Sequence, residues 1–314
     1  MSIAAQIIAA QIILDAARAE GFELAGLTSA LPHRDFARYS DWVERGLAAG
    51  MTYLTDHRAA VREDPRSLLP TARTMLCVGK LYNAAGPGRD DEHGWISRYA
   101  WGARDYHEVM REGLQRVVER LRGVLPDFEY RIVVDTAPLL ERSYAREAGL
   151  GWIGKNTCLI NQPDGSWYFL AEALFSFEVD GFGEPASDRC GSCQRCIEAC
   201  PTVAIVQGPQ GWELDAAKCI SYWTIEARTE APEELQKAFG THLFGCDICQ
   251  DVCPWNRRAP DTAETAFQPA NACPDLVELN ADEFRNRFRD TPVARTKVDG
   301  YNRNVRVALE NRGE

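Results

Sequence analysis

The segment CGSCQRCIEACP, residues 190–201, carries four cysteines in the spacing C-x2-C-x2-C-x3-C, and a proline follows the last of them. This spacing is typical of bacterial ferredoxins. A tight loop can direct Cys190, Cys193 and Cys196 at one [4Fe–4S] cluster, while Cys200 lies on the helix that follows and binds a second cluster. The segment therefore predicts a ferredoxin-like domain with two clusters.

A second cysteine run, in FGCDICQDVCPWN (244–256), supplies further ligands. It is one cysteine short, because Val252 stands where a third cysteine of a C-x2-C-x2-C run would be. Cys219, between the two runs, can replace the missing ligand. Eight cysteines then complete two clusters with none left over. We predict that cluster one is bound by Cys190, Cys193, Cys196 and Cys253, and cluster two by Cys200, Cys219, Cys246 and Cys249.

Zinc sites and disulfides are the two alternatives to iron–sulfur clusters for these cysteines. A pair of zinc sites is the rival, but zinc usually shows paired C-x2-C or Cys/His spacing, so the triple run and the two Cys-Pro endings favour iron. Disulfides are disfavoured in a cytosolic chain. Outside the two runs, Cys77 lies in an apolar strand and is expected in the core. Cys158 and Cys273 have no partners in the sequence and are expected to be structural.

Composition and charge bound the possible locations and partners. The 314 residues include 46 acidic and 35 basic side chains, for a net charge of −11. Such a chain has no long-range attraction to nucleic acid or to an anionic membrane, although residues 284–314 carry a net +4. The N-terminus lacks the basic region of a signal peptide, and no run of about 18 apolar residues occurs. We therefore expect a cytoplasmic protein that does not enter a membrane.

Helical and strand patterns alternate over residues 1–180, which predicts an α/β or α+β domain. Apolar residues recur at helical spacing in residues 3–14 and 109–125. Short apolar runs predict strands at residues 22–27, 74–78, 130–134, 157–160 and 168–177. Gly, Pro, Ser and Asp cluster at residues 180–189 and mark a boundary. We expect an α/β (α+β) domain at 1–182, a ferredoxin-like domain at 183–258 and a helical segment at 259–314.

Asp135 is the candidate acid of the first domain. It follows the strand predicted at 130–134 and precedes Thr136-Ala137-Pro138. Strand ends in α/β domains open onto ligand crevices, and a carboxyl group there can act as a general acid if burial raises its pKa. The alternative is that Asp135 only caps a turn or the next helix.

Three other stretches, residues 149–154, 155–157 and 98–107, could serve either ligand binding or packing. Residues 149–154 match G-x-G-x-x-G, but they follow a helical pattern instead of a strand, so we interpret these glycines as close approaches of the backbone to the sheet. Lys155-Asn156-Thr157 after them could bind polar substituents or form a plain loop. Aromatic and charged residues are concentrated in residues 98–107. They could bind a large planar ligand, and half-buried packing explains them equally well. They are Arg98, Tyr99, Trp101, Asp105, Tyr106 and His107.

The residues alone leave the redox cofactor open. Two one-electron clusters suit a partner cofactor that reacts in one-electron steps, such as flavin, haem or cobalamin. The cobalamin motif with a histidine ligand, D-x-H-x-x-G, is not present, since its nearest counterpart at residues 105–110 lacks the glycine.

Several stretches together resemble the epoxyqueuosine reductase family over about residues 20–312. They are SRYAWGARDYH (97–107), VVDTAPLLERSYAREAGLGWIGKNTCLI (133–160), CGSCQRCIEACPTVAI (190–205), CISYWTIE (219–226) and FGCDICQDVCPWN (244–256). The resemblance implies a base-off cobalamin in the α/β domain and two [4Fe–4S] clusters fed by an external electron donor that the sequence does not identify. It implies the reduction of epoxyqueuosine to queuosine at the wobble position of tRNA.

The resemblance also implies roles for single residues. Asp135 matches the proton donor of the family. Longer members continue into a helical-repeat domain that grips tRNA, and residues 259–314 would be its beginning. We expect tail arginines such as Arg303 and Arg306 to contact tRNA phosphates, the alternative being that they pair with the acidic body of the protein. The cobalamin pocket is expected to include Arg58, Ser97, Arg98, Tyr99, Trp101, Lys155, Asn156 and Ser221.

Two other functions stay open at this point. One is a reductive dehalogenase-like cobalamin and iron–sulfur reductase of a small substrate, and the other is an electron-carrier iron–sulfur protein without catalysis of its own. We expect the protein to be a monomer.

Overall fold

A four-stranded sheet forms the centre of the computed structural model, which describes residues 3–313. Its strands lie in the order β1-β2-β7-β4, and every neighbouring pair is antiparallel. The first domain is therefore of the α+β kind, without parallel β-α-β units. The strands predicted in these four regions are confirmed, with the bounds β1 (Leu24–Ser29), β2 (Thr74–Leu81), β4 (Tyr130–Val133) and β7 (Tyr168–Phe175).

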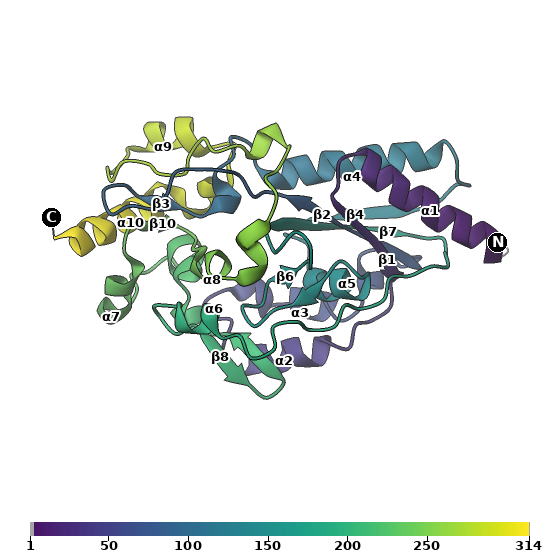
Figure 1. Cartoon of the computed structure of the whole chain (residues 1–314), viewed down its shortest axis with the longest axis horizontal. Coiled ribbons are helices and arrows are strands. Elements are labelled where there is room, and N and C mark those ends of the chain that lie inside the picture. Colours follow the sequence, from purple (N-terminus) through teal and green to yellow (C-terminus); the bar gives the residue numbers. More distant parts are fainter. Residues whose placement is uncertain (1–2, 314) are drawn as a thin grey trace.

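Helices cover both faces of this sheet (Figure 1). α1 (Ile3–Ala19) and α4 (Tyr106–Arg122) lie on one face, and α5 (Glu141–Glu147) lies on the other. Side chains alternate between the faces of β7, so Ala171 and Ala173 pack toward α1 and α4, while Leu174 packs toward α5. The apolar stripe of α4 is fully buried, and each such side chain contributes roughly 1.5–3 kcal/mol relative to an exposed one.

The glycines of residues 149–154 behave as the sequence predicted. They lead into the short strand β5 (Trp152–Ile153), which pairs with β6 (Leu159–Ile160), and not into a helix. A Cβ atom on Gly151 would lie 2.2 Å from the carbonyl oxygen of Ile160, so a side chain there would collide with the neighbouring strand. The dinucleotide interpretation is thereby excluded at these residues.

The cysteine-rich segment consists of short elements. α6 (Arg195–Glu198) and α8 (Ile248–Asp251), one from each cysteine run, pack against each other. A hairpin of β8 (Ile205–Gly208) and β9 (Gly211–Leu214) and a π-helical turn at Tyr222–Glu226 separate them. Two short helices, α2 (Phe36–Glu44) and α3 (Arg58–Val61), belong to the N-terminal half and lie on the α5 side of the sheet (Figure 1).

The C-terminal residues are helical, as predicted, and share a core with other parts of the chain. That core includes Phe244, Phe284, Phe288, Tyr301 and Val305. Its elements include β3 (Trp95–Ile96), β10 (His242–Phe244), which pairs in parallel with β3, α9 (Ala281–Phe288) and α10 (Lys297–Arg312). The short helix α7 (Glu233–Gln236) precedes β10 in the chain and buries none of its residues. Within residues 3–313, no helix combines the length and apolar character needed to cross a bilayer.

Candidate functional site

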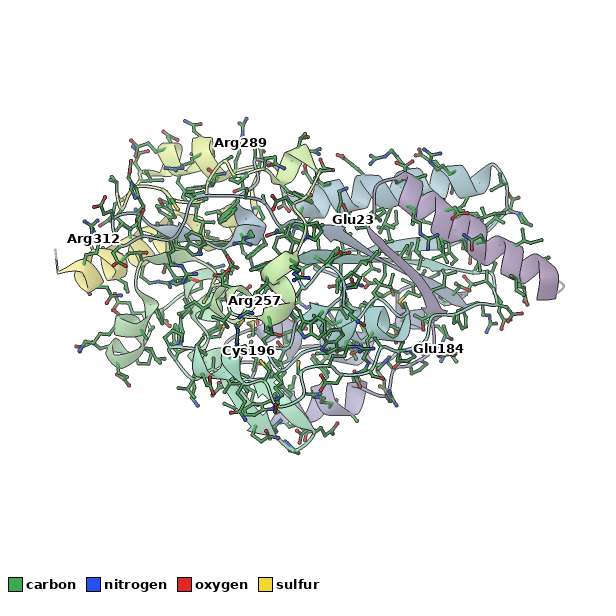
Figure 2. All side chains as sticks on the ribbon, viewed as in Figure 1. Glu23, Glu184, Cys196, Arg257, Arg289 and Arg312 are labelled. Atoms are coloured by element: carbon green, nitrogen blue, oxygen red, sulfur yellow. The ribbon has the colours of Figure 1, made fainter. Side chains whose placement is uncertain are left out.

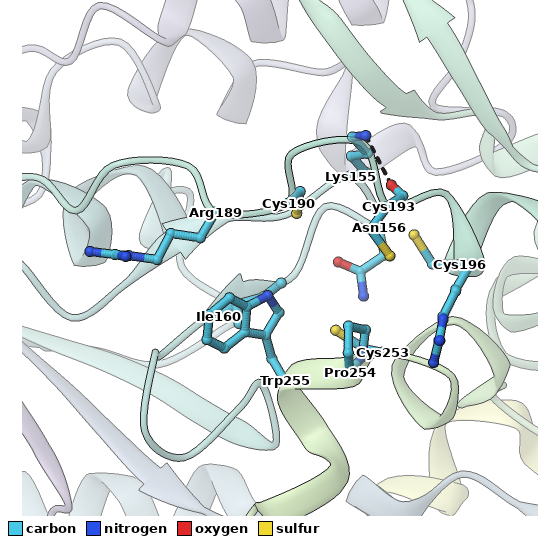
Figure 3. Close-up of a pocket in the computed structure, with 11 residues that line it drawn as sticks. Lys155, Asn156, Ile160, Arg189, Cys190, Cys193, Cys196, Cys253, Pro254 and Trp255 are labelled. Atoms are coloured by element: carbon cyan, nitrogen blue, oxygen red, sulfur yellow. Dashed lines mark hydrogen bonds between the residues drawn. The ribbon is translucent and has the colours of Figure 1, made fainter.

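Four of the eight predicted ligands surround one cavity of about 300 Å³ near the surface (Figure 3). They are the four assigned to cluster one: Cys190, Cys193, Cys196 and Cys253. Cys253 comes from the second cysteine run, and the packing of α8 against α6 brings it to the first. Lys155 holds the loop in place, because its Nζ donates to the carbonyl oxygens of Gly191 at 2.7 Å and Cys193 at 2.9 Å.

The electrostatics of this cavity suit thiolates that are compensated by iron. Burial, together with the neighbouring charges of Cys190, Cys253 and Cys193, raises the pKa of Cys196 to about 11. Among the described residues, no three His, Cys, Asp or Glu side chains converge on a point that a single metal ion could occupy. Thiols spread around a cavity fit a four-iron cluster better than a lone zinc ion.

The other four ligands, assigned to cluster two, lie deeper. Burial raises the pKa of Cys246 to about 12, with Cys219 among the charges that act on it, and Cys200 acts in turn on Cys219. Burial also raises the pKa of Cys249 well above its usual value, and Cys246 and Cys219 again contribute. These interactions indicate that Cys219 lies near Cys200, Cys246 and Cys249, and the assignment of the four to one cluster stays a prediction.

The remaining cysteines have structural surroundings. Cys77 is fully buried in β2, so its predicted place in the core is confirmed. Cys158 lies between the two ligand groups, because Cys253, Cys219 and Cys249 all interact with it electrostatically. Its backbone groups are engaged by Gly154 and Asn156.

A second cavity, of about 510 Å³, opens between the α5 face of the sheet and the α2–α3 segment. Ala216, which stands three residues before Cys219 in the sequence, forms part of its wall. Glu213 also lines it, and Oε1 of this buried carboxylate has no hydrogen-bond partner among the described residues. Apolar walls include Tyr39, Trp42, Met51, Tyr53, Leu54, Ala137, Leu139, Leu140, Ile153 and Leu214.

This cavity fits a large macrocycle with amide side chains. Apolar walls with a few well-placed polar groups are the usual form of a cofactor site. The unpaired Glu213 oxygen offers an acceptor for an amide N–H, and the guanidinium groups of Arg38, Arg62 and Arg142 line the same space. The residues present therefore fit cobalamin.

Asp135 stands at the mouth of this cavity and has an unusual backbone. Its φ is +45°, a region that few non-glycine residues occupy and that is costly without compensation. Its carboxylate oxygen Oδ2 accepts hydrogen bonds from the Tyr106 hydroxyl at 2.9 Å and from Nε2 of His107 at 3.0 Å. Its partners are side chains, not the backbone N–H groups of a helix start, so the geometry favours a site residue over a cap.

The pKa values at this group differ from the expectation for an isolated acid. Burial alone would raise the pKa of Asp135, but the hydrogen bond and charge of His107 outweigh it, and the pKa is lowered. Burial would likewise lower the pKa of His107, yet its bonds to Asp105 and Asp135 raise it to about 9. The expectation that burial would raise the pKa of Asp135 is wrong here, because His107 holds the proton.

The residues predicted for the cobalamin pocket divide into two sets. The Arg58 guanidinium lies 5.7 Å from the centre of the Tyr53 ring, and Tyr53 lines the cavity. Burial raises the pKa of Tyr99, and the charge of Asp135 raises it as well. Ser221 lies beside Cys219, and Lys155 and Asn156 line the cluster-one cavity. Their contacts with cobalamin stay predictions.

The other predicted pocket residues have their polar groups satisfied within the protein. Ser97 donates to the buried Asp247. Arg98 donates to Asn83 and stacks over Trp167 at 4.3 Å, and Trp101 donates to the carbonyl oxygen of Ile96. Their side chains do not line the 510 Å³ cavity.

Sequence reasoning did not assign roles to His107, Tyr106 and Glu141. The crowded stretch at residues 98–107 contained the first two, but nothing in the sequence links them to Asp135, which lies 28 residues after His107. Arg295 was also missed as a site residue: it pairs with Glu226 at 2.8 Å, and its charge helps to lower the pKa of Asp135.

The tail arginines mostly pair with the protein itself. Arg303 donates to the carbonyl oxygens of Trp223, Ala227 and Thr229, so its guanidinium is already occupied. Arg306 pairs with Glu278 at 2.8 Å and is half-exposed. The prediction that Arg303 contacts tRNA phosphates is wrong, because its bonds point into the protein.

An α+β domain with a large cofactor cavity, joined to eight cysteines in two groups of four, defines a redox enzyme fed by two iron–sulfur clusters. A model of a "4Fe-4S double cluster binding domain" matches residues 189–256, and a model described as "Epoxyqueuosine reductase QueG, DUF1730" matches residues 62–136. The chain is 39% identical to the epoxyqueuosine reductase of Xanthomonas campestris, over 96% of this chain and 87% of the relative. It is 35% identical to that of Escherichia coli, over 93% and 78%.

The chain belongs to the epoxyqueuosine reductase family, and it is an oxidoreductase whose cofactors are cobalamin and two [4Fe–4S] clusters. A crystal structure of epoxyqueuosine reductase with an epoxyqueuosine-modified tRNA-Tyr stem loop superposes with a TM-score of 0.86 at 28% identity, over 96% of this chain and 80% of that one. A reductive dehalogenase shares only the fold, with a TM-score of 0.53 at 15% identity, over 84% of this chain and 34% of that one.

Proposed function

We propose that this chain reduces epoxyqueuosine to queuosine in tRNA, with Asp135 as the group that donates a proton to the departing oxygen. One observation carries the proposal: Tyr106 and His107 hold the carboxylate of Asp135, which lines a cavity large enough for a cofactor. The stem loop bound to the related reductase supports tRNA as the substrate partner.

The reaction converts an epoxide to an alkene and water, so it consumes two electrons and two protons. When bound, the clusters and cobalamin supply the electrons. His107 holds a proton at its hydrogen bond to Asp135, and this proton can pass through the carboxyl group to the oxygen that leaves. Tyr106 donates to the same carboxylate oxygen and fixes its direction.

The cavity residues have distinct tasks in this proposal. The apolar side chains around Trp42 and Tyr53 would hold the faces of cobalamin and exclude water. Glu213 and the arginines at the wall would bind its amide groups. The eight cysteines in their two groups would hold the clusters.

The external electron donor is proposed to be a small acidic protein that carries single electrons. Cluster one lies nearer the surface than cluster two, and none of the eleven residues that line its cavity is acidic. We call four exposed arginines the basic rim: Arg189 and Arg195 line this cavity, and Arg257 and Arg258 closely follow the lining residue Trp255 in the sequence. Arg257 and Cys196 are both labelled in Figure 2. An acidic carrier would be steered to this rim on a chain that is otherwise negative.

A direct assay tests the proposed function. Anaerobically purified protein with iron and cobalamin bound is incubated with a chemical reductant and tRNA from a strain that lacks this activity, and the nucleosides are analysed by mass spectrometry. We expect epoxyqueuosine to lose one oxygen atom. Turnover of a bromophenol without any queuosine would assign the chain to the dehalogenases, and protein that binds clusters but no cobalamin would make it an electron carrier.

A further inference from the structure

A buried hydroxyl group lies beside Cys200 and has no role in the mechanism above. Thr202 is only 6% exposed. Among the residues that the structure describes, the one partner of its Oγ1 atom is the Sγ atom of Cys200 at 3.6 Å, a hydrogen-bond length for an acceptor as large as sulfur. A buried hydroxyl without a partner is unfavourable, so this contact satisfies it. When a cluster is bound, Cys200 is a thiolate that can only accept, and Thr202 is therefore the donor.

The backbone directs a second donor at the same sulfur atom. The N–H of Ala204 donates to Sγ of Cys200 at 3.3 Å. The turn that brings it there is closed by a hydrogen bond from the N–H of Val203 to the carbonyl oxygen of Cys200 at 3.1 Å. Val203 has a φ of +52°, which is costly for a β-branched residue, and its exposed side chain packs against nothing that would impose this conformation. The hydrogen bonds to Cys200 offset part of this cost.

The second Cys-Pro sequence of the chain offers an internal comparison. Cys200-Pro201-Thr202 in the first cysteine run corresponds to Cys253-Pro254-Trp255 in the second. Backbone N–H groups of Trp255 and Asn256 donate to Cys253, so backbone donors are common to both runs. The second residue after Cys253 is a tryptophan, which has no hydroxyl group. The hydroxyl donor at this position therefore distinguishes Cys200, the predicted ligand of cluster two, from Cys253, the predicted ligand of cluster one.

We propose that Thr202 is a positioning residue that acts through Cys200 to raise the reduction potential of cluster two, which favours electron transfer from cluster one toward cobalamin. This inference rests on the proposed function and on the predicted assignment of Cys200 to cluster two. Each one-electron reduction adds negative charge to a cluster and its sulfur ligands, and a hydrogen bond to one of these sulfurs stabilises that charge. Electrons from the external donor enter at cluster one, whose cavity is open to the surface, so a higher potential at cluster two makes the inward transfer more favourable.

Thr202→Val tests the inference in the holoenzyme, because valine keeps the branched shape and removes the hydroxyl. A redox titration followed by EPR should show that the equilibrium constant for the reduction of cluster two falls about three- to tenfold, where tenfold corresponds to 59 mV for one electron. The potential of cluster one and the KM for tRNA should not change. Thr202→Ser, which keeps a donor, should recover most of the wild-type potential. Thr202→Ala removes the same hydroxyl and gives a second measurement if the valine variant binds less iron.

Thr74→Val is the matched control for the loss of a buried threonine hydroxyl. Thr74 lies in β2, away from the cysteine runs, and its hydroxyl donates to the carbonyl oxygen of Phe177 at 2.8 Å. Both cluster potentials should stay at their wild-type values in this variant. The EPR signal that survives in Cys253→Ser identifies cluster two in all of these titrations.

The possible outcomes separate the inference from the proposed function. An unchanged potential of cluster two in Thr202→Val and Thr202→Ala with full iron content would overturn the role of Thr202. A shift confined to cluster one would overturn it as well, because Cys200 would then bind the other cluster. Wild-type protein that holds both clusters and cobalamin but forms no queuosine would refute the proposed function instead, and the potentials would still be measurable.

Discussion

Replacing Asp135 by Asn should change both the chemistry and the protonation of its neighbour His107. Asparagine has nearly the same shape and tolerates the positive φ of this position, so the fold should be kept. It cannot donate an acidic proton, and kcat for epoxyqueuosine tRNA should fall about 10²- to 10⁴-fold. The iron content should not change, because no cysteine ligand is affected, and the cobalamin content should not change, because asparagine keeps the shape of this part of the cavity wall.

The expected change at His107 follows from its two partners. Asp105 and Asp135 raise the pKa of His107 from 6.5 to about 9. They do so although the side chain is only 20% exposed and burial lowers the pKa of a histidine. Each tenfold change in proton affinity corresponds to about 1.4 kcal/mol, so the two carboxylates stabilise the imidazolium by roughly 3 kcal/mol net of burial. Asp105 remains in the variant, bonded to Nδ1 at 2.6 Å. If the carboxylates contribute about equally, the pKa should fall to about 7–8 in Asp135→Asn.

The pKa of His107 can be measured by NMR titration of the oxidised enzyme, in which the clusters have no net electron spin. The chain has five histidines, and His107→Gln assigns the signal. Because the folded pKa is raised, this contribution to stability is complete below pH 6.5 and is lost as the pH rises through about 9. Asp105→Asn is the matched variant: it should lower the same pKa yet keep the acid. A wild-type pKa near 6.5, or one that Asp135→Asn leaves unchanged, would refute the coupling.

Three further predictions concern the clusters, the donor and the tail. Cys253→Ser should damage the cluster bound by the first cysteine run and spare cluster two, as seen by EPR. Arg257→Glu with Arg258→Glu should slow cluster reduction by reduced flavodoxin about 10-fold or more at low salt, while reduction by dithionite stays unchanged. Arg303→Ala should lower the free energy of unfolding by about 1–3 kcal/mol, because it leaves the partly buried carbonyl groups of Trp223 and Ala227 unpaired, and should not change the salt dependence of tRNA binding. Arg306→Ala, which removes a half-exposed ion pair, should cost at most about 1 kcal/mol.

Matched variants make these three tests decisive. Cys273→Ser should leave both EPR signals intact, and equal damage to the two clusters in Cys253→Ser would contradict the crossed assignment. Arg111→Glu with Arg131→Glu makes the same change of charge at exposed positions on α4 and β4 and should not slow the carrier. If the basic-rim variant lost affinity for tRNA and kept its rate of cluster reduction by flavodoxin, the rim would be a tRNA-binding surface and not a docking site for the electron carrier. A weaker salt dependence of tRNA binding in Arg303→Ala would show that Arg303 does contact a tRNA phosphate.

Most of the correct predictions about the fold and the clusters came from local sequence patterns. The two cysteine runs indicated a two-cluster domain because a cluster loop is formed by a few consecutive residues, and the crossed sharing follows from ligand counting. Periodicity located the helices and strands, since the burial of one face repeats along each element. The resemblance of whole stretches then pointed to the family that the comparisons confirm.

Contacts between distant residues depended on the fold. The alternation of strands and helices did not show that the sheet is antiparallel. The direction of strand pairing depends on the path of the connections between strands, which the sequence pattern does not reveal. The proton held by His107 reverses the expected pKa of Asp135, and it depends on a contact across 28 residues. Arg303 looked free in the sequence, yet the packing of α10 directs it at three carbonyl groups. Glu172 reads as an ordinary residue of a strand, and only burial between β2, β4 and α5 gives it a proton at neutral pH, because a charge there would have neither water nor a partner.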